Sequence, residues 1–210
     1  VNNSESLRDI YSKFLPEIIS LSNKFGQSKI IYNSLVKLKE TNNFDQIKNR
    51  ILDKEILEMQ HRGISLQKND QEEFNNISEK LGKLSTDFSN NVLDATNKWF
   101  LILNKKSEVD GLPERVLELM AISAHNHLKK DEEVDIKNGP WKLSLDIPTY
   151  TSFMTYATDR NLREKLYKAF VGRASQGEKN NSQIIEEILS LRTKQANLLG
   201  YKSWAELSLS

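Results

Sequence analysis

The stretch FNNISEKLGKLSTDFSNNVLDATNKW, residues 74–99, decides the fold class of this chain. Its apolar residues recur at steps of three or four, at Phe74, Ile77, Leu81, Leu84, Phe88, Val92, Ala95 and Trp99. An α-helix has about 3.6 residues per turn, so this spacing places all of them on one face. We therefore predict one long amphipathic helix from about Asn69 to Lys98, with an apolar face that other helices must cover.

Shorter segments with the same periodicity lie on both sides of the long helix. Pro16 is expected to kink the first of them, and Asp159 is expected to cap another at its N-terminus. A final helix from Ser203 reaches Ser210 after barely two turns, so we expect the gene product to continue beyond this residue. The other predicted helices occupy residues 4–24, 28–39, 44–61, 113–128, 150–156, 159–170 and 184–200.

Two segments break the helical rhythm. Residues 99–104 form a short apolar run, and residues 141–146 alternate between apolar and polar side chains. This alternation is typical of a strand with one buried face. We expect a small antiparallel pair in which one side of the second strand faces a core and the other faces water. The core side carries Trp141, Leu143 and Leu145, and the water side carries Lys142, Ser144 and Asp146.

These patterns predict a mainly α fold, a helical bundle-like region with a small antiparallel β-hairpin. We expect residues 1–210 to form a single helical region. Its subdivisions are expected at residues 1–66 (helices), 67–146 (the long helix and the hairpin) and 147–210 (helices).

Composition excludes several classes of function. The chain has 30 Lys and Arg residues and 29 Asp and Glu residues, which gives a net charge of +1. It therefore lacks the basic excess of a protein that binds nucleic acid or anionic membranes. Cysteine is absent, which excludes disulfides and thiolate chemistry and favours an intracellular, cytoplasmic location. The longest apolar run, residues 99–103, is far shorter than the roughly 20 residues of a membrane-spanning helix. Residues 1–6 show no signal peptide.

The three histidines do not form the helical zinc motif H-E-x-x-H, whose histidines lie one turn apart. His61 is followed by Arg62 and has Ser65 four positions on. His125 and His127 are two positions apart, which on a helix points them about 200° away from each other. We therefore assign no metal-binding, catalytic or cofactor-binding residue in this chain.

Three further candidate sites have weaker patterns. Residues 172–177 match the outer frame of a phosphate-binding loop, but Glu178 stands where that loop needs lysine. The carboxylates around residue 132 could hold a cation. The flanking lysines, however, favour the interpretation that residues 129–137 form a solvated loop. Aromatic residues after residue 140 could line a peptide groove, although core packing is the favoured interpretation. The carboxylates are Asp131, Glu132, Glu133 and Asp135, and the aromatic residues are Trp141, Tyr150, Phe153 and Tyr156.

Several longer segments resemble the oligopeptidase A and thimet oligopeptidase family of zinc peptidases. The similar segments occur in the same order along nearly the whole chain, from about Glu5 to Ser210. Within the family, the chain most resembles oligopeptidase A and the plant organellar oligopeptidases. The segments are 88–96 (FSNNVLDAT), 139–141 (GPW), 145–150 (LDIPTY), 161–170 (NLREKLYKAF), 173–175 (RAS), 181–182 (NS), 185–189 (IEEIL), 191–192 (LR) and 198–201 (LLGY).

This resemblance implies a larger, clam-shaped α peptidase that cleaves short peptides in a deep channel with a zinc-activated water. The family's zinc ligands lie downstream of the matched region, so this chain is expected to be a channel wall from the upstream half, inactive without the C-terminal catalytic half. Because activation of a bound water needs the metal itself, zinc is a cofactor of the parent protein only. The resemblance also admits an organellar lumen as the location, if the source is a eukaryote.

A helical adaptor or coiled-coil interaction module is the alternative from another class. The heptad-like face of residues 74–99 favours it, because coiled coils repeat apolar residues in this way. The strand-like segments at residues 99–104 and 141–146 argue against it, since a coiled coil stays helical.

Overall fold

In the computed structural model, which describes residues 4–129 and 134–210, the chain divides into two units. The first comprises Val1–Asp87 and Gln183–Ser210, and the second comprises Phe88–Ser182. Together they are mainly helical with one two-stranded antiparallel sheet, as the sequence predicts. None of the helices in the described part of the chain has the length and apolarity needed to cross a lipid bilayer.

The helices of the first unit begin close to where the sequence places them. Ser4, Ser28 and Asp45 each accept a hydrogen bond from a backbone N–H in the first turn of the helix that follows. Such caps satisfy donors that the helix itself leaves unpaired. The unit contains α1 (Glu5–Gly26), α2 (Lys29–Thr41), α3 (Gln46–His61), most of α4 (Lys68–Lys98), α8 (Ser182–Leu198) and α9 (Trp204–Leu209).

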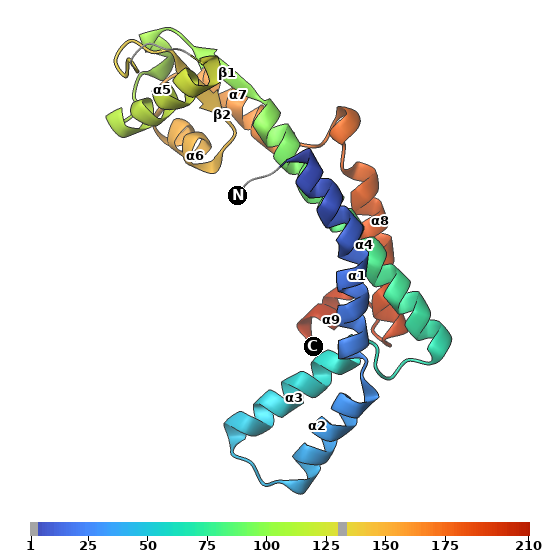
Figure 1. Cartoon of the computed structure of the whole chain (residues 1–210). Coiled ribbons are helices and arrows are strands. Elements are labelled where there is room, and N and C mark those ends of the chain that lie inside the picture. Colours follow the sequence, from blue (N-terminus) through green and yellow to red (C-terminus); the bar gives the residue numbers. More distant parts are fainter. Residues whose placement is uncertain (1–3, 130–133) are drawn as a thin grey trace. The chain divides into compact units, whose positions relative to one another are not determined.

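The long helix predicted around residues 74–99 is confirmed as α4, and in the first unit α1 and α8 pack along it (Figure 1). Gly82 lets α1 approach, because a Cβ built there would lie 2.3 Å from Ile19 Cδ1. Towards α8, Gln195 Nε2 donates a hydrogen bond of 3.0 Å to Ser78 Oγ. Phe74 and Ile77 of α4 are buried.

The apolar stripe of α1 is not covered by the described residues. Its members are between 48% and 69% exposed, although they follow the three- and four-residue steps of an amphipathic helix. Leu15 and Ile19, the residues nearest a Cβ at Gly82 of α4, are partly buried instead. We use the name α1 stripe for Leu7, Ile10, Phe14, Ile18, Leu21 and Phe25.

The second unit is built on the antiparallel pair of β1 (Phe100–Leu103) and β2 (Trp141–Ser144). In this register Leu101 is opposite Leu143 and Leu103 is opposite Trp141. Trp141, Leu143 and Leu145 are buried, which confirms the predicted face, whereas Asp146 is exposed and the other two residues of the polar side are half-buried. One of them, Lys142, lies over the Phe100 ring with Nζ 4.9 Å from its centroid.

Helices complete the core of the second unit. Its largest fully buried side chains are Trp141, Phe153, Met120, Leu143, Leu145 and Leu166. The sequence predicts Pro113 in the first turn of a helix. In the structure Pro113 lies one position earlier, at the N-cap of α5. The elements besides α4 and the strands are η1 (Lys106–Val109), α5 (Glu114–Leu128), α6 (Ile147–Tyr156), α7 (Arg160–Val171) and η2 (Gly177–Lys179).

Asp146 determines where α6 begins, because its carboxylate accepts a hydrogen bond of 3.0 Å from the backbone N–H of Thr149. Although the Asp146 residue as a whole is exposed, neighbouring protein atoms shield its carboxyl from part of the solvent, which would raise its pKa. Hydrogen bonds from the Ser144 hydroxyl and from Thr149 outweigh this effect and lower the pKa. The helix also starts before Pro148, which the first turn tolerates because it lacks only an N–H that has no helical partner.

The lowered pKa of Asp146 predicts a specific dependence of stability on pH. A carboxyl whose pKa is lower in the folded state stabilises the fold above its unfolded pKa, about 3.9, and loses this contribution as pH falls through the folded value. We expect Asp146→Ala to cost about 1 kcal/mol near pH 6 and progressively less below about pH 4. Urea unfolding between pH 6 and pH 2.5 measures this difference, and a cost that stays constant with pH would contradict it.

Candidate functional site

A pocket of about 810 Å³ lies in the second unit, between the end of α4 and the loop after α7. The loop runs from Gly172 to Lys179. It contains residues 172–177, whose sequence partly matches the pattern of a phosphate-binding loop. It follows the helix α7 and not a strand, so it does not have the setting of a nucleotide-binding loop. The remaining lining residues are Asp94, Ala95, Lys98, Trp99, Leu145, Lys168 and Ala169.

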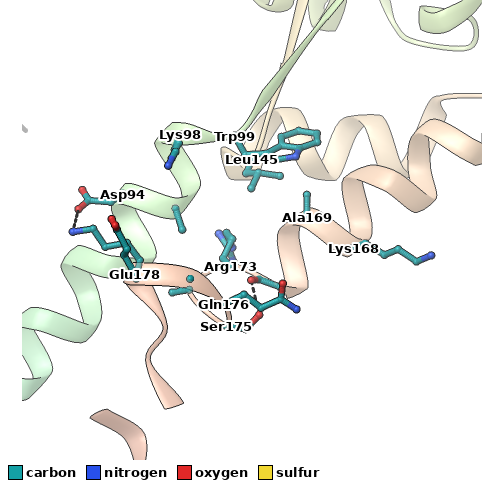
Figure 2. A pocket seen from close by; sticks show the side chains of 15 residues that line it. Asp94, Lys98, Trp99, Leu145, Lys168, Ala169, Arg173, Ser175, Gln176 and Glu178 are labelled. Carbon is teal, nitrogen blue, oxygen red and sulfur yellow. Dashed lines mark hydrogen bonds and ion pairs between the residues drawn. The ribbon is translucent and has the colours of Figure 1, made fainter. Parts of the chain in front are cut away.

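Arg173 lies in the middle of the lining residues, with Lys98, Trp99 and Leu145 on one side (Figure 2). Its Nε donates a hydrogen bond of 2.8 Å to the Phe170 carbonyl oxygen, and a terminal nitrogen donates one of 3.3 Å to Thr96 Oγ1. The guanidinium carbon also lies 3.6 Å from the centroid of the Phe170 ring. A guanidinium held in this way keeps its remaining N–H donors in a fixed direction.

Carboxylates neutralise only some of the cations around the pocket. Lys168 Nζ lies 2.6 Å from Glu164 Oε1, and Lys179 Nζ lies 3.0 Å from Asp94 Oδ2. Among the described residues no ion pair involves Lys98 or Arg173. Glu178 also lines the pocket and has no ion pair among the described residues, so it offsets part of the charge of Lys98 and Arg173. The lining remains positive, because its four cations (Lys98, Lys168, Arg173 and Lys179) outnumber its two acids (Asp94 and Glu178).

Asn181 holds the loop in place from inside the protein. Its side chain is buried, accepts a hydrogen bond of 2.8 Å from Asn91 Nδ2 and donates one of 3.1 Å to the Phe88 carbonyl oxygen. Its backbone N–H donates to the carbonyl oxygen of Ala174, which has a φ of +51°, in the left-handed region. Because non-glycine residues seldom adopt this region, the loop conformation is imposed by its contacts.

The three histidines belong to different units of the fold. His61 belongs to the first unit, where its Nε2 is 2.9 Å from the Tyr201 hydroxyl, whereas His125 and His127 lie on α5 of the second unit. The His127 ring packs edge-on against Phe100 at 4.3 Å between centroids. No group of three His, Asp or Glu side chains that could hold a metal ion occurs in residues 4–129 and 134–210.

The aromatic residues that could have lined a groove are divided between core and surface. Trp141 and Phe153 are fully buried, which confirms core packing for these two. Tyr150 stacks on Phe170 at 3.8 Å, and Tyr156 is exposed. In the carboxylate cluster, Asp131, Glu132 and Glu133 lie outside the described residues, and Asp135 accepts hydrogen bonds from Asn138 that lower its pKa.

Arg173, Lys98 and Trp99 did not emerge as site residues from the sequence. For Arg173, the sequence pattern that could have indicated its position is the three-residue step from Phe170, because residues three apart at a helix end can stack on each other. The contact with Thr96, 77 positions away, has no counterpart in a sequence pattern.

Two family models match this sequence. Residues 1–71 match the one described as "Neurolysin/Thimet oligopeptidase, N-terminal domain", and residues 153–210 match "Peptidase family M3". Whole proteins with similar sequences include "Probable cytosolic oligopeptidase A" and "Organellar oligopeptidase A, chloroplastic/mitochondrial" of Arabidopsis thaliana, both 39% identical over 213 residues. "Oligopeptidase A" of Escherichia coli (strain K12) is 34% identical over 218 residues.

Each of these alignments includes 100% of this chain but only 30%, 27% and 31% of the respective relative. The chain therefore spans about three tenths of the length of the relatives that it matches.

Proposed function

Because this chain belongs to the oligopeptidase A and thimet oligopeptidase family, we propose that it is the upstream region of a zinc-dependent endopeptidase that hydrolyses short peptides. Similarity along the whole chain carries this proposal, since collinear matches of this length are far more specific than any short motif. The names of the relatives supply the substrate class, oligopeptides.

The proposed role of this region is structural. Its described residues contain no group of three side chains suited to a metal ion, and we propose that other residues of the longer protein bind the zinc that would activate a water for attack on the peptide bond. The helices and the strand pair would wall the channel that admits peptides. The C-terminal catalytic half is therefore the expected partner of this region.

The α1 stripe supports the view that this region is part of something larger. Monomeric proteins seldom expose a contiguous apolar face of this kind, and such faces normally mark a contact with another surface. We propose that the longer protein covers it. The relatives named cytosolic and chloroplastic/mitochondrial support a location inside the cell, in the cytosol or an organelle.

The coding sequence and a cleavage assay test this proposal together. Read in frame beyond Ser210, the gene is expected to encode a helix with H-E-x-x-H and, further on, a Glu that completes the zinc site. The 210-residue chain should leave a fluorogenic oligopeptide uncleaved, and the chain extended through the motif should cleave it. The matched control is the extended protein with the first motif histidine replaced by alanine, in which cleavage should fall to background.

Two results would overturn the peptidase proposal. One is a downstream sequence with no zinc motif, and the other is cleavage that survives both a chelator and loss of the motif histidine. Either would favour the helical adaptor, for which the α1 stripe would be the binding face for a partner helix.

A further inference from the structure

We infer that the pocket around Arg173 binds the C-terminal carboxylate of a peptide, with the last apolar side chain of that peptide against Trp99. The choice of a peptide as ligand rests on the proposed function. The anion and the apolar contact come from the residues of the pocket itself.

The anion follows from the charges of the lining. Arg173 has a fixed guanidinium with Nε and one terminal nitrogen already engaged by Phe170 and Thr96, and no described carboxylate pairs with it. A planar guanidinium matches the two oxygens of a carboxylate, and the hydrogen bonds that form are charge-assisted. Lys98 adds a second cation to the same lining, and the one lining acid without an ion pair among the described residues, Glu178, offsets this charge only in part.

An organic anion fits the rest of the pocket better than an inorganic one. The volume of about 810 Å³ lies in the range of pockets that enclose drug-sized ligands, far more than one ion needs. Trp99 and Ala169 are half-buried and give the lining an apolar part beside the two cations. A peptide end has this pair of features, a carboxylate next to a side chain.

The loop also meets a requirement of specific binding, because its shape is set before any ligand arrives. The buried Asn181 joins the loop to α4, because its backbone N–H donates to the Ala174 carbonyl oxygen and its side chain donates to the Phe88 carbonyl oxygen. Within the loop, the Ser175 hydroxyl donates to the Gly172 carbonyl oxygen at 2.8 Å. A lining that is already ordered loses little conformational entropy on binding.

Calorimetry on the 210-residue chain tests the site without any catalysis. The probe is a pentapeptide of four glycines and a C-terminal leucine, compared with the same peptide ending in an amide, with a pentaglycine acid and with inorganic phosphate. The leucine acid should bind at least about tenfold more tightly than the amide, and the pentaglycine acid should bind several-fold more weakly. Phosphate should compete only at much higher concentration.

Variants assign the effect to particular side chains. Arg173→Gln should weaken binding of the acid at least about tenfold and leave binding of the amide unchanged. Because Arg173 also packs on Phe170, Lys98→Gln provides a second test that leaves this packing untouched. Arg173→Lys keeps the positive charge but not the planar guanidinium. Each variant should bind the leucine acid several-fold more weakly than the unaltered chain. The control is Lys165→Gln, an exposed lysine of α7 outside the pocket, which should bind like the unaltered chain.

Three outcomes would overturn the site: no binding of the acid, equal binding of acid and amide, or phosphate that competes as well as the peptide. The last would indicate a general anion site. These outcomes are independent of the peptidase proposal, which depends on the downstream zinc motif, and absence of that motif would leave the binding results unaltered.

Discussion

Replacement of Phe153 by Ala is expected to lower the free energy of unfolding of the second unit by about 3–5 kcal/mol. Phe153 is 0% exposed and lies in one core with Trp141, Leu143 and Leu166. Removal of the ring forfeits its burial and leaves a cavity that the sheet and α5 can fill only in part. Urea unfolding followed by tryptophan fluorescence measures the loss, because Trp141 lies in the same core.

Tyr156 on the same helix provides the matched control. Its side chain is 52% exposed, so Tyr156→Ala should change the free energy of unfolding by no more than about 1 kcal/mol. Similar losses for the two variants would mean that α6 does not contribute its inner face to the core as described.

Gly111→Ala is the second change with a large expected effect, about 3 kcal/mol or more. Gly111 has a φ of +85°, and a Cβ built on it lies 2.3 Å from the Tyr156 carbonyl oxygen and 3.0 Å from Thr158 Cγ2. The neighbouring backbone cannot easily retreat, because the Thr158 N–H donates a hydrogen bond of 3.0 Å to the Asp110 carbonyl oxygen. The variant must both strain its own backbone and displace this contact.

Gly200 separates these two causes. It also has a φ of +85°, but a Cβ built there meets nothing within 4 Å. Gly200→Ala should therefore cost only the left-handed strain, roughly 1–2 kcal/mol. Thermal or urea unfolding of both variants gives the comparison, and equal costs would show that the clash at Gly111 is relieved by a backbone shift.

Sequence periodicity was enough to predict the elements of this fold because their local patterns are strong. The stripe from Phe74 to Trp99 predicts α4, and the alternation from Trp141 to Leu145 predicts which face of β2 is buried. Asp159 was identified as a cap from its position alone, and its carboxylate accepts from the N–H groups of Asn161 and Leu162.

What the sequence could not provide depends on long-range contacts. Periodicity gives α1 an apolar face but does not say whether this chain covers it, and the structure leaves the α1 stripe exposed. The pocket needs Arg173 to meet Thr96, and its loop needs Asn181 to meet Phe88, 93 positions away. Contacts between polar side chains that are far apart in the sequence produce no local sequence pattern. The candidate site could therefore be identified only from the folded structure.

The exposed α1 stripe also bears on how the proposed longer protein is synthesised. A ribosome makes α1 before every other described helix, and translation adds about 5–20 residues per second. In a protein as long as the relatives, of which this chain spans about three tenths, the stripe would wait roughly tens of seconds for a downstream covering surface. During that interval it presents the kind of apolar surface that holdase chaperones bind, so α1 would be a chaperone-binding segment of the nascent chain.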